Sequence, residues 1–200
     1  MACMALWLSC SMCNTPPGGG HDRQDSVKYL FDGDGFFCGI KMENADSSVY
    51  RVVWGRDGAT NVTTATFDVQ GNGTLELVGK SRDAFILSQG CGTSCTYDVI
   101  LPLTGEARES VFMFVKAIDT ARNLIAYIPE TDSSFIRVEN YLTRKKMDIP
   151  GDDLCPAAFK GDCIDSCFFE QEFFVYSWNG KSWSTDNADL KQKKVPLELK

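Results

Sequence analysis

Beyond residue 26, short apolar or alternating runs recur about every ten residues, separated by glycine, asparagine, aspartate and serine. Most runs are rich in Val, Ile, Phe, Tyr and Thr, which strands prefer. No stretch carries a sustained apolar period of about 3.6 residues, and Asp186–Lys194 is the best helix candidate. We predict strands over Val27–Phe31, Phe36–Met42, Ser48–Trp54, Thr63–Val69, Thr74–Gly79, Ala84–Ser88, Thr96–Leu101, Val111–Ala117, Leu124–Pro129, Phe135–Leu142, Phe173–Trp178 and Ser182–Ser184.

Three dipeptides between strand-like runs are typical of tight hairpin turns: Asp57-Gly58, Asn72-Gly73 and Asn179-Gly180. Asn-Gly and Asp-Gly supply the positive φ angles that a two-residue turn needs. Hairpins in succession predict an all-β fold, an antiparallel meander that forms a sandwich or barrel. The alternative is a small propeller-like β-repeat, with blades of about 40–45 residues. Residues 27–200 hold four such blades at most, and no clean internal repeat is visible at that period.

The first 26 residues differ in composition from the rest of the chain. Ala5–Cys10 is a short hydrophobic segment that ends in a small residue and a cysteine, and residues 11–26 form a Pro/Gly-rich linker. The Leu-Ser-Cys-Ser sequence around Cys10 resembles the signals of bacterial lipoproteins, in particular those of the Bacteroidota. The resemblance implies that residues 1–10 are a lipoprotein-type signal segment, that Cys10 carries lipid, and that residues 27–200 form the folded domain.

Phrases in the body of the chain carry a second resemblance. Phe67–Leu77 and Phe174–Trp183 are similar to pieces of bacterial secreted β-repeat proteins, and Phe85–Tyr97 resembles uncharacterised lipoproteins of the same group. Such families have no assigned activity, so the resemblance implies a location and a fold rather than a mechanism.

Charge and histidine content exclude several classes of function. The net charge of −7 argues against nucleic acid as a partner, because phosphate binding needs a basic surface. The one histidine, His21, lies in the linker, so a site built on a positioned imidazole is not expected. No run reaches the roughly 20 apolar residues that a membrane-spanning helix needs, so a lipid anchor is the expected attachment to a membrane.

Nine cysteines favour an oxidising compartment and a domain stapled by disulfides. Cys91 and Cys95 enclose a small flexible loop and are the favoured pair, and a second bridge is expected within residues 155–167. Cys-x3-Cys occurs at 91/95 and at 163/167, so a zinc site is the alternative, but we predict neither a metal nor a cofactor. The disulfide candidates within the domain are Cys38, Cys91, Cys95, Cys155, Cys163 and Cys167.

Two further patterns are candidates for chemistry. A two-residue loop at Asn179-Gly180 would pair Tyr176 with Trp183 and place both on one face with Trp178, either as core or as an exposed row that binds a sugar or a protein. The sequence Phe31-Asp32-Gly33-Asp34-Gly35 matches a calcium loop in part, but Phe36 and Phe37 stand where a ligand and a glycine are required, which favours a hairpin turn.

Taken together, the sequence predicts a lipid-anchored exported protein with a non-catalytic binding or structural role at the bacterial cell envelope. It would be periplasmic or anchored in the outer membrane, or alternatively secreted, with a protein or glycan as ligand. The alternatives are a carbohydrate-active hydrolase that uses carboxylates, and an inhibitor of a secreted enzyme. The hydrolase would need two carboxylates facing each other across a cleft, and the candidates are Asp152, Asp153, Glu170 and Glu172.

Overall fold

The computed structural model describes residues 27–44, 48–56, 58–69, 73–92, 95–104, 108–130, 134–151, 160–179 and 190–200. The predicted signal segment and linker, residues 1–26, lie outside the described residues. Within them the chain forms sixteen strands and one short 3₁₀ helix, η1 (Lys160–Cys163). The predicted all-β class is therefore confirmed.

The strands form four antiparallel sheets in chain order. Sheet 1 contains β1 (Val27–Gly33), β2 (Phe36–Met42), β3 (Val49–Arg56), β4 (Ala59–Val62) and β5 (Phe67–Asp68). Sheet 2 contains β6 (Glu76–Lys80), β7 (Ala84–Gly92), β8 (Cys95–Pro102) and β9 (Ser110–Met113). Sheet 3 contains β10 (Val115–Asp119), β11 (Leu124–Tyr127), β12 (Ser134–Asn140) and β13 (Lys146–Pro150). Sheet 4 contains β14 (Ile164–Glu170), β15 (Phe173–Asn179) and β16 (Leu190–Pro196).

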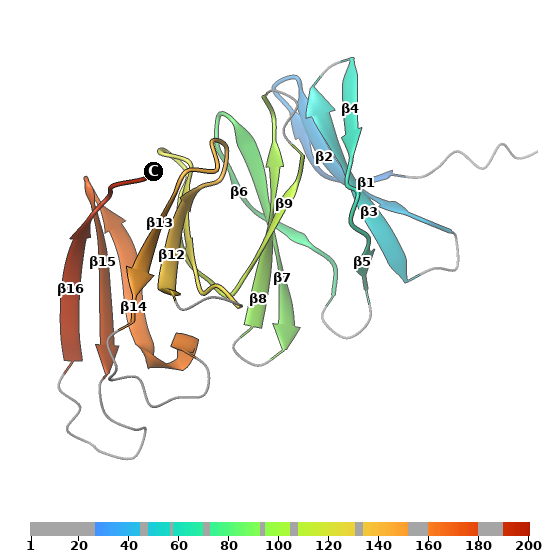
Figure 1. Cartoon of the computed structure of the whole chain (residues 1–200). Coiled ribbons are helices and arrows are strands. Elements are labelled where there is room, and N and C mark those ends of the chain that lie inside the picture. The colour runs from blue at the N-terminus through green and yellow to red at the C-terminus, as the bar shows by residue number, and fades with distance from the viewer. Residues whose placement is uncertain are drawn as a thin grey trace, which may run out of the picture.

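The four sheets stand in an open row, from sheet 1 in blue and cyan to sheet 4 in orange and red (Figure 1). Each pair of neighbours packs face to face over its own cluster of buried side chains, as layers of a sandwich do. We call these contacts the 1/2, 2/3 and 3/4 junctions. The meander expected from the sequence is thus divided into successive short antiparallel sheets. A small antiparallel sheet is also the repeated unit of the propeller-like alternative.

The two inner sheets are buried on both faces, and β7 shows how the sequence achieves this. Its first four residues, Ala84 to Leu87, are at most 1% exposed. Successive side chains of a strand point to opposite faces. Phe85 and Leu87 accordingly pack in the 1/2 junction, whereas Ala84 and Ile86 pack in the 2/3 junction. The continuous apolar run is therefore the signature of a middle layer.

Two short turns behave as the sequence predicted. Gly33 pairs with Phe36 across Asp34-Gly35, where both turn residues have positive φ (55° and 73°). This is the geometry of a tight hairpin, so Asp32 and Asp34 belong to a turn rather than to a calcium loop. β3 and β4 likewise pair with Arg56 opposite Ala59, and Gly58 before β4 has a φ of 81°; Asp57 lies outside the described residues.

Other expectations about local structure are wrong. Asn72-Gly73 does not close a hairpin, because β5 before it pairs with β3 and β6 after it pairs with β7. The predicted strand Val111–Ala117 is two strands that belong to different sheets, and Phe114 between them has a φ of 54°. The helix candidate Asp186–Lys194 overlaps β16, which pairs with β15.

The expected register after Asn179-Gly180 is also wrong. Tyr176 lies opposite Lys193 and Trp178 opposite Lys191, not opposite residues 183 and 181. The partner strand β16 places Val195 opposite Phe174, where both side chains pack in the 3/4 junction. The predicted partner strand at 182–184 lies outside the described residues.

Candidate functional site

Two residues of the predicted aromatic row lie in the core, and the third lies outside the described residues. Tyr176 and Trp178 lie on β15, the central strand of sheet 4, and are 2% and 7% exposed. Together with Phe174 they point toward sheet 3 and fill the 3/4 junction, where the Tyr176 ring lies 6.1 Å from that of Phe135. Trp183 lies outside the described residues. Tyr176 and Trp178 are therefore core residues and not an exposed platform for a ligand.

The predicted carboxylate pair does not face a cleft. Glu170 at the end of β14 and Glu172 in the following turn are both exposed. Glu170 accepts a hydrogen bond from Lys194 Nζ at 2.8 Å, across the solvent-facing side of sheet 4. Asp152 and Asp153 lie outside the described residues. The geometry at Glu170 is that of a surface ion pair with Lys194, which contributes little to stability.

The cysteines separate into bonded and free groups. Cys91 and Cys95 form a disulfide with a Cα–Cα distance of 5.1 Å, and Cys163 is also disulfide-bonded. Cys38 and Cys167 are free, so these two disulfide candidates are corrected. Their ladder neighbours explain this, since Cys38 lies opposite Trp54 on β3 and Cys167 lies opposite Tyr176 on β15.

Burial keeps both free thiols protonated at neutral pH. It raises the pKa of Cys38 to about 12 and that of Cys167 to about 11, where Lys116 acts weakly in the opposite direction. Cys10 and Cys155, the predicted lipid-bearing residue and the candidate partner in the second bridge, lie outside the described residues.

The best-connected polar group in the described chain is one that the sequence did not single out, Gln89 on β7. Its side chain is 6% exposed and points into the 1/2 junction. Its Oε1 accepts hydrogen bonds from Tyr50 Oη on β3, at 3.1 Å, and from Tyr97 Oη on β8. Its Nε2 donates to the main-chain oxygens of Asp68 at 3.2 Å and Gly73 at 2.8 Å. The amide thus joins three strands and the connection between the two sheets.

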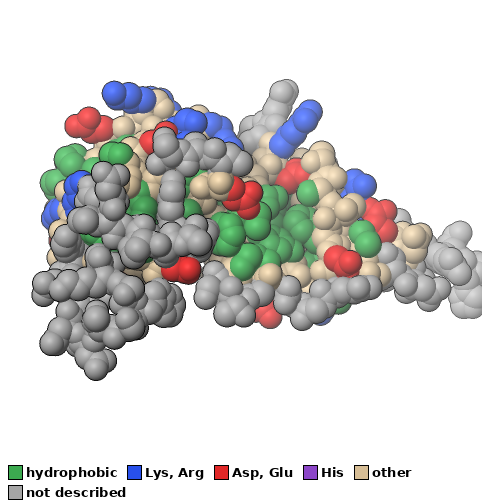
Figure 2. Space-filling view, turned by 60° about the horizontal axis from the view of Figure 1, so that its bottom comes forward, with side chains coloured by type: hydrophobic (Ala, Val, Ile, Leu, Met, Phe, Trp, Pro, Cys, Tyr) green, Lys and Arg blue, Asp and Glu red, His purple; other side chains and the backbone are tan. Residues whose placement is uncertain are grey.

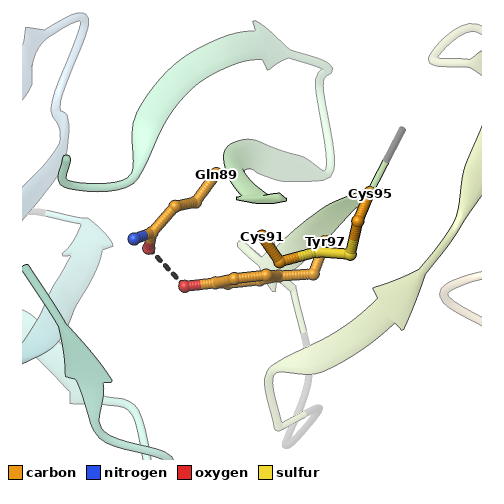
Figure 3. Close-up of a disulfide and its surroundings, with 4 residues drawn as sticks. All are labelled: Gln89, Cys91, Cys95 and Tyr97. Atoms are coloured by element: carbon orange, nitrogen blue, oxygen red, sulfur yellow. Dashed lines mark hydrogen bonds between the residues drawn. A yellow bond between two sulfur atoms is a disulfide. The ribbon is translucent and has the colours of Figure 1, made fainter. Parts of the chain in front are cut away.

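We call Gln89, Tyr50 and Tyr97 the Gln89 cluster. Gln89 and Tyr97 lie beside the Cys91–Cys95 disulfide (Figure 3). The Tyr50 hydroxyl, besides donating to Gln89, accepts a hydrogen bond from the Leu75 amide at 2.8 Å. Burial raises the pKa of Tyr97 to about 12, so its hydroxyl remains a donor at physiological pH. The cluster is a structural lock between sheets 1 and 2. The alternation of β7 could have revealed it, because Gln89 shares a face with the buried Phe85 and Leu87.

The 2/3 junction contains a charged cluster of Tyr127, Glu139 and Arg144. Glu139 on β12 is 4% exposed and accepts a hydrogen bond from Tyr127 Oη at 2.9 Å. Its other oxygen lies 3.0 Å from Arg144 Nε, and the Arg144 guanidinium also lies over the Phe112 ring of sheet 2 at 5.5 Å. Burial, followed by the hydrogen bond to Glu139, raises the pKa of Tyr127 to about 12. The cluster holds two sheets together.

Asp98 on β8 is a second buried carboxylate. It lies on the same face of sheet 2 as Ile100, which packs in the 2/3 junction. Asp98 is 5% exposed. Burial raises its pKa, and a hydrogen bond with Ser88 on the neighbouring strand opposes that shift. No buried side-chain nitrogen or oxygen of the described residues lacks a hydrogen-bond partner. The buried polar side chains of the described residues are thus hydrogen-bonded within the fold.

Three shallow grooves lie on the surface of the described residues. A groove of about 540 Å³ lies between β13 and the end of the described chain, and others of about 310 Å³ and 440 Å³ lie beside β2–β3 and between β10 and β14. Within the described ranges no three His, Cys, Asp or Glu side chains are grouped so as to hold a metal ion. None of the helices in that part of the chain is long and apolar enough to cross a membrane.

Comparisons with known proteins give no relative of this chain. No protein-family model, no curated protein and no solved structure matches it.

Proposed function

We propose that this chain is an exported, lipid-anchored bacterial protein that serves a binding or structural role at the cell envelope, with Cys10 as the residue that carries lipid. The role is non-catalytic, and the ligand is a protein or a glycan. The periplasm or the outer membrane is the proposed location.

One observation carries the non-catalytic role: the buried polar side chains of the described residues bond to partners within the fold instead of converging on a cleft. Gln89 links β3, β7 and β8, and Glu139 links β11 to the turn after β12. Groups used in this way position the layers of a scaffold. A site for general acid–base catalysis would instead leave such groups within reach of a substrate.

Two further features support export and surface contact. Disulfides at Cys91–Cys95 and at Cys163 suit an oxidising compartment. The open row also leaves exposed apolar side chains available for a ligand, among them Tyr29 on β1, at 56% exposure, and Phe168 on β14, at 44%. Figure 2 shows hydrophobic side chains gathered in the middle of one face, with basic side chains along a rim.

The test is the mass of the protein recovered from a bacterial host that processes lipoproteins. We expect the chain in the membrane fraction to begin at Cys10 and to carry covalent lipid, because the resemblance at Leu8-Ser9-Cys10 implies cleavage there. Cys10→Ala should remove the lipid and release the chain from membranes. Cys13→Ala, which changes a cysteine three residues away, should do neither. Recovery of an unprocessed, lipid-free Met1 chain would contradict the proposal.

A further inference from the structure

The hairpin formed by β7 and β8 carries both the disulfide and the lock between sheets 1 and 2. In its ladder Gln89 lies directly opposite Tyr97. Cys91 follows Gln89 by two residues and Cys95 precedes Tyr97 by two, so the bridge closes the hairpin just beyond this pair. The register shifts between Gly90 and Gly92, which interrupts the regular ladder at this end. The disulfide is therefore the covalent brace where the hydrogen-bonded ladder is weakest.

Tyr97 connects the end of the β7–β8 hairpin to sheet 1. Its hydroxyl donates to Gln89 Oε1, and its ring stacks on Phe67 of β5, with centroids 6.2 Å apart and planes within 11°. Gln89 in turn donates to the main-chain oxygens of Asp68, the last residue of β5, and of Gly73, which lies three residues before β6. If the end of the hairpin splays, the Tyr97 hydroxyl leaves Gln89 and the amide loses the partner that orients it toward Asp68 and Gly73.

Both sulfur-bearing residues are reachable from solvent. Cys91 and Cys95 are partly exposed, unlike the fully buried Cys38. Thiol–disulfide exchange needs access of a thiolate to one of the two sulfurs, and accessible bridges are the ones that take part in such exchange.

We propose that the Cys91–Cys95 disulfide is a redox-sensitive switch that sets how firmly sheet 1 is attached to the rest of the molecule, acting through Tyr97 and Gln89. When the bridge is closed, the Gln89 cluster is complete and Gln89 holds Tyr50, Asp68 and Gly73. When the bridge is reduced, the pairing of β7 with β8 beyond Gln89 and Tyr97 opens and these contacts loosen. The proposal does not depend on the lipid anchor.

The reductant is a dithiol. One of its sulfurs, as thiolate, attacks a bridge sulfur, the Cys91–Cys95 bond breaks, and the released cysteine takes up a proton. The second dithiol sulfur then attacks the mixed disulfide and frees the other cysteine. The bridge gains two electrons and two protons and becomes two thiols, while the dithiol loses the same and becomes a disulfide.

The experiment measures amide hydrogen exchange in the full chain before and after treatment with dithiothreitol, with alkylation to report which cysteines were reduced. The reporter is the Leu75 amide, which donates to Tyr50 within the cluster. We expect its exchange to accelerate about tenfold or more on reduction and to recover on reoxidation. The Tyr141 amide, which donates to the main-chain oxygen of Asn123 beside sheet 3, should not change.

Four variants separate the switch from general destabilisation. Cys91→Ser/Cys95→Ser should show fast exchange at Leu75 with no further response to dithiothreitol. Tyr97→Phe keeps the bridge and removes the hydroxyl, so exchange at Leu75 should be fast in both redox states. Tyr127→Phe, which removes a buried hydroxyl from the 2/3 junction, and Cys163→Ser, which removes the other disulfide, should both retain the redox response.

Two results would overturn the proposal. The first is alkylation of Cys91 and Cys95 after reduction with unchanged exchange at Leu75. The second is a bridge that dithiothreitol reduces only when the whole chain unfolds, as judged by simultaneous exchange at Leu75 and Tyr141.

Discussion

The 1/2 and 2/3 junctions hold equivalent sheets together by different means. The 1/2 junction buries twelve hydrophobic side chains, among them Tyr50, Trp54 and Phe85, and its buried polar group is the neutral Gln89. The 2/3 junction buries six and includes the ion pair of Glu139 with Arg144 at its side. Buried apolar area is the main source of stability. The smaller junction therefore relies more on its polar contacts, and the two should respond differently to mutation, salt and pH.

The largest expected effect comes from truncating neighbours on β7 that face opposite junctions. Phe85→Ala should reduce the free energy of unfolding by about 3–5 kcal/mol and Ile86→Ala by about 2–4 kcal/mol, since both side chains are at most 1% exposed and leave cavities. Urea denaturation measures both values. The contrast between the junctions fails if Ile86→Ala is the more damaging change.

Removal of the Gln89 amide should have the next largest effect. Gln89→Leu leaves two tyrosine hydroxyls and two main-chain oxygens without their partner, so we expect a loss of about 2–3 kcal/mol, measured in the same way. Gln192→Leu is the matched control, because Gln192 on β16 is exposed and should change stability by less than about 0.5 kcal/mol. Equal losses in the two variants would show that Gln89 is not a lock.

The ion pair of the 2/3 junction should contribute less. Arg144→Ala removes the contacts to Glu139, Ser110 and the Phe112 ring, but Arg144 is 57% exposed and water screens its charge. We expect a loss of about 1 kcal/mol that becomes smaller at high salt. Lys194→Ala breaks the surface pair with Glu170, in which both side chains are about half exposed, and should have almost no effect. If the loss of stability in Arg144→Ala did not depend on salt, the charge of Arg144 would not explain how this junction is held together.

The smallest effect concerns pH and has the opposite sign. Burial raises the folded-state pKa of Asp98, so the folded protein binds a proton more readily than the unfolded chain, and stability falls as pH rises through that pKa. Asp98→Asn lacks this charge and keeps an acceptor for Ser88. The variant should be more stable than the wild type at neutral pH, and the difference should vanish at a pH below both pKa values. Denaturation curves at both pH values measure it, and equal stability at neutral pH would contradict the assignment.

The local features that depend only on residues adjacent in the sequence could be predicted. The turn at Asp34-Gly35 and the positive φ of Gly58 follow from backbone preferences that the residues carry themselves. Strands with buried apolar faces, such as β2 and β7, were found because burial selects their residues. The short strand β4 and the lysine-rich β16 were missed because they lie at sheet edges, where exposed side chains need not be apolar.

The candidate site was predicted less well than the fold. The Cys91–Cys95 bridge was expected because the small loop between the two residues can close by itself. The role of Gln89 was not, because its partners are as far as 39 residues away in the sequence. Tyr176 and Trp178 were open to two interpretations, and only the position of sheet 3 against them decided for core.

By itself the sequence determined the β class, the tight turn at Asp34-Gly35 and the local disulfide, because each depends on residues that are close along the chain. The tertiary structure decided where the chain passes from one sheet to the next, which faces are covered and which polar groups lock the layers. These depend on contacts between distant strands, and the same apolar run fits a single sandwich or a middle layer until its second face is seen to be covered.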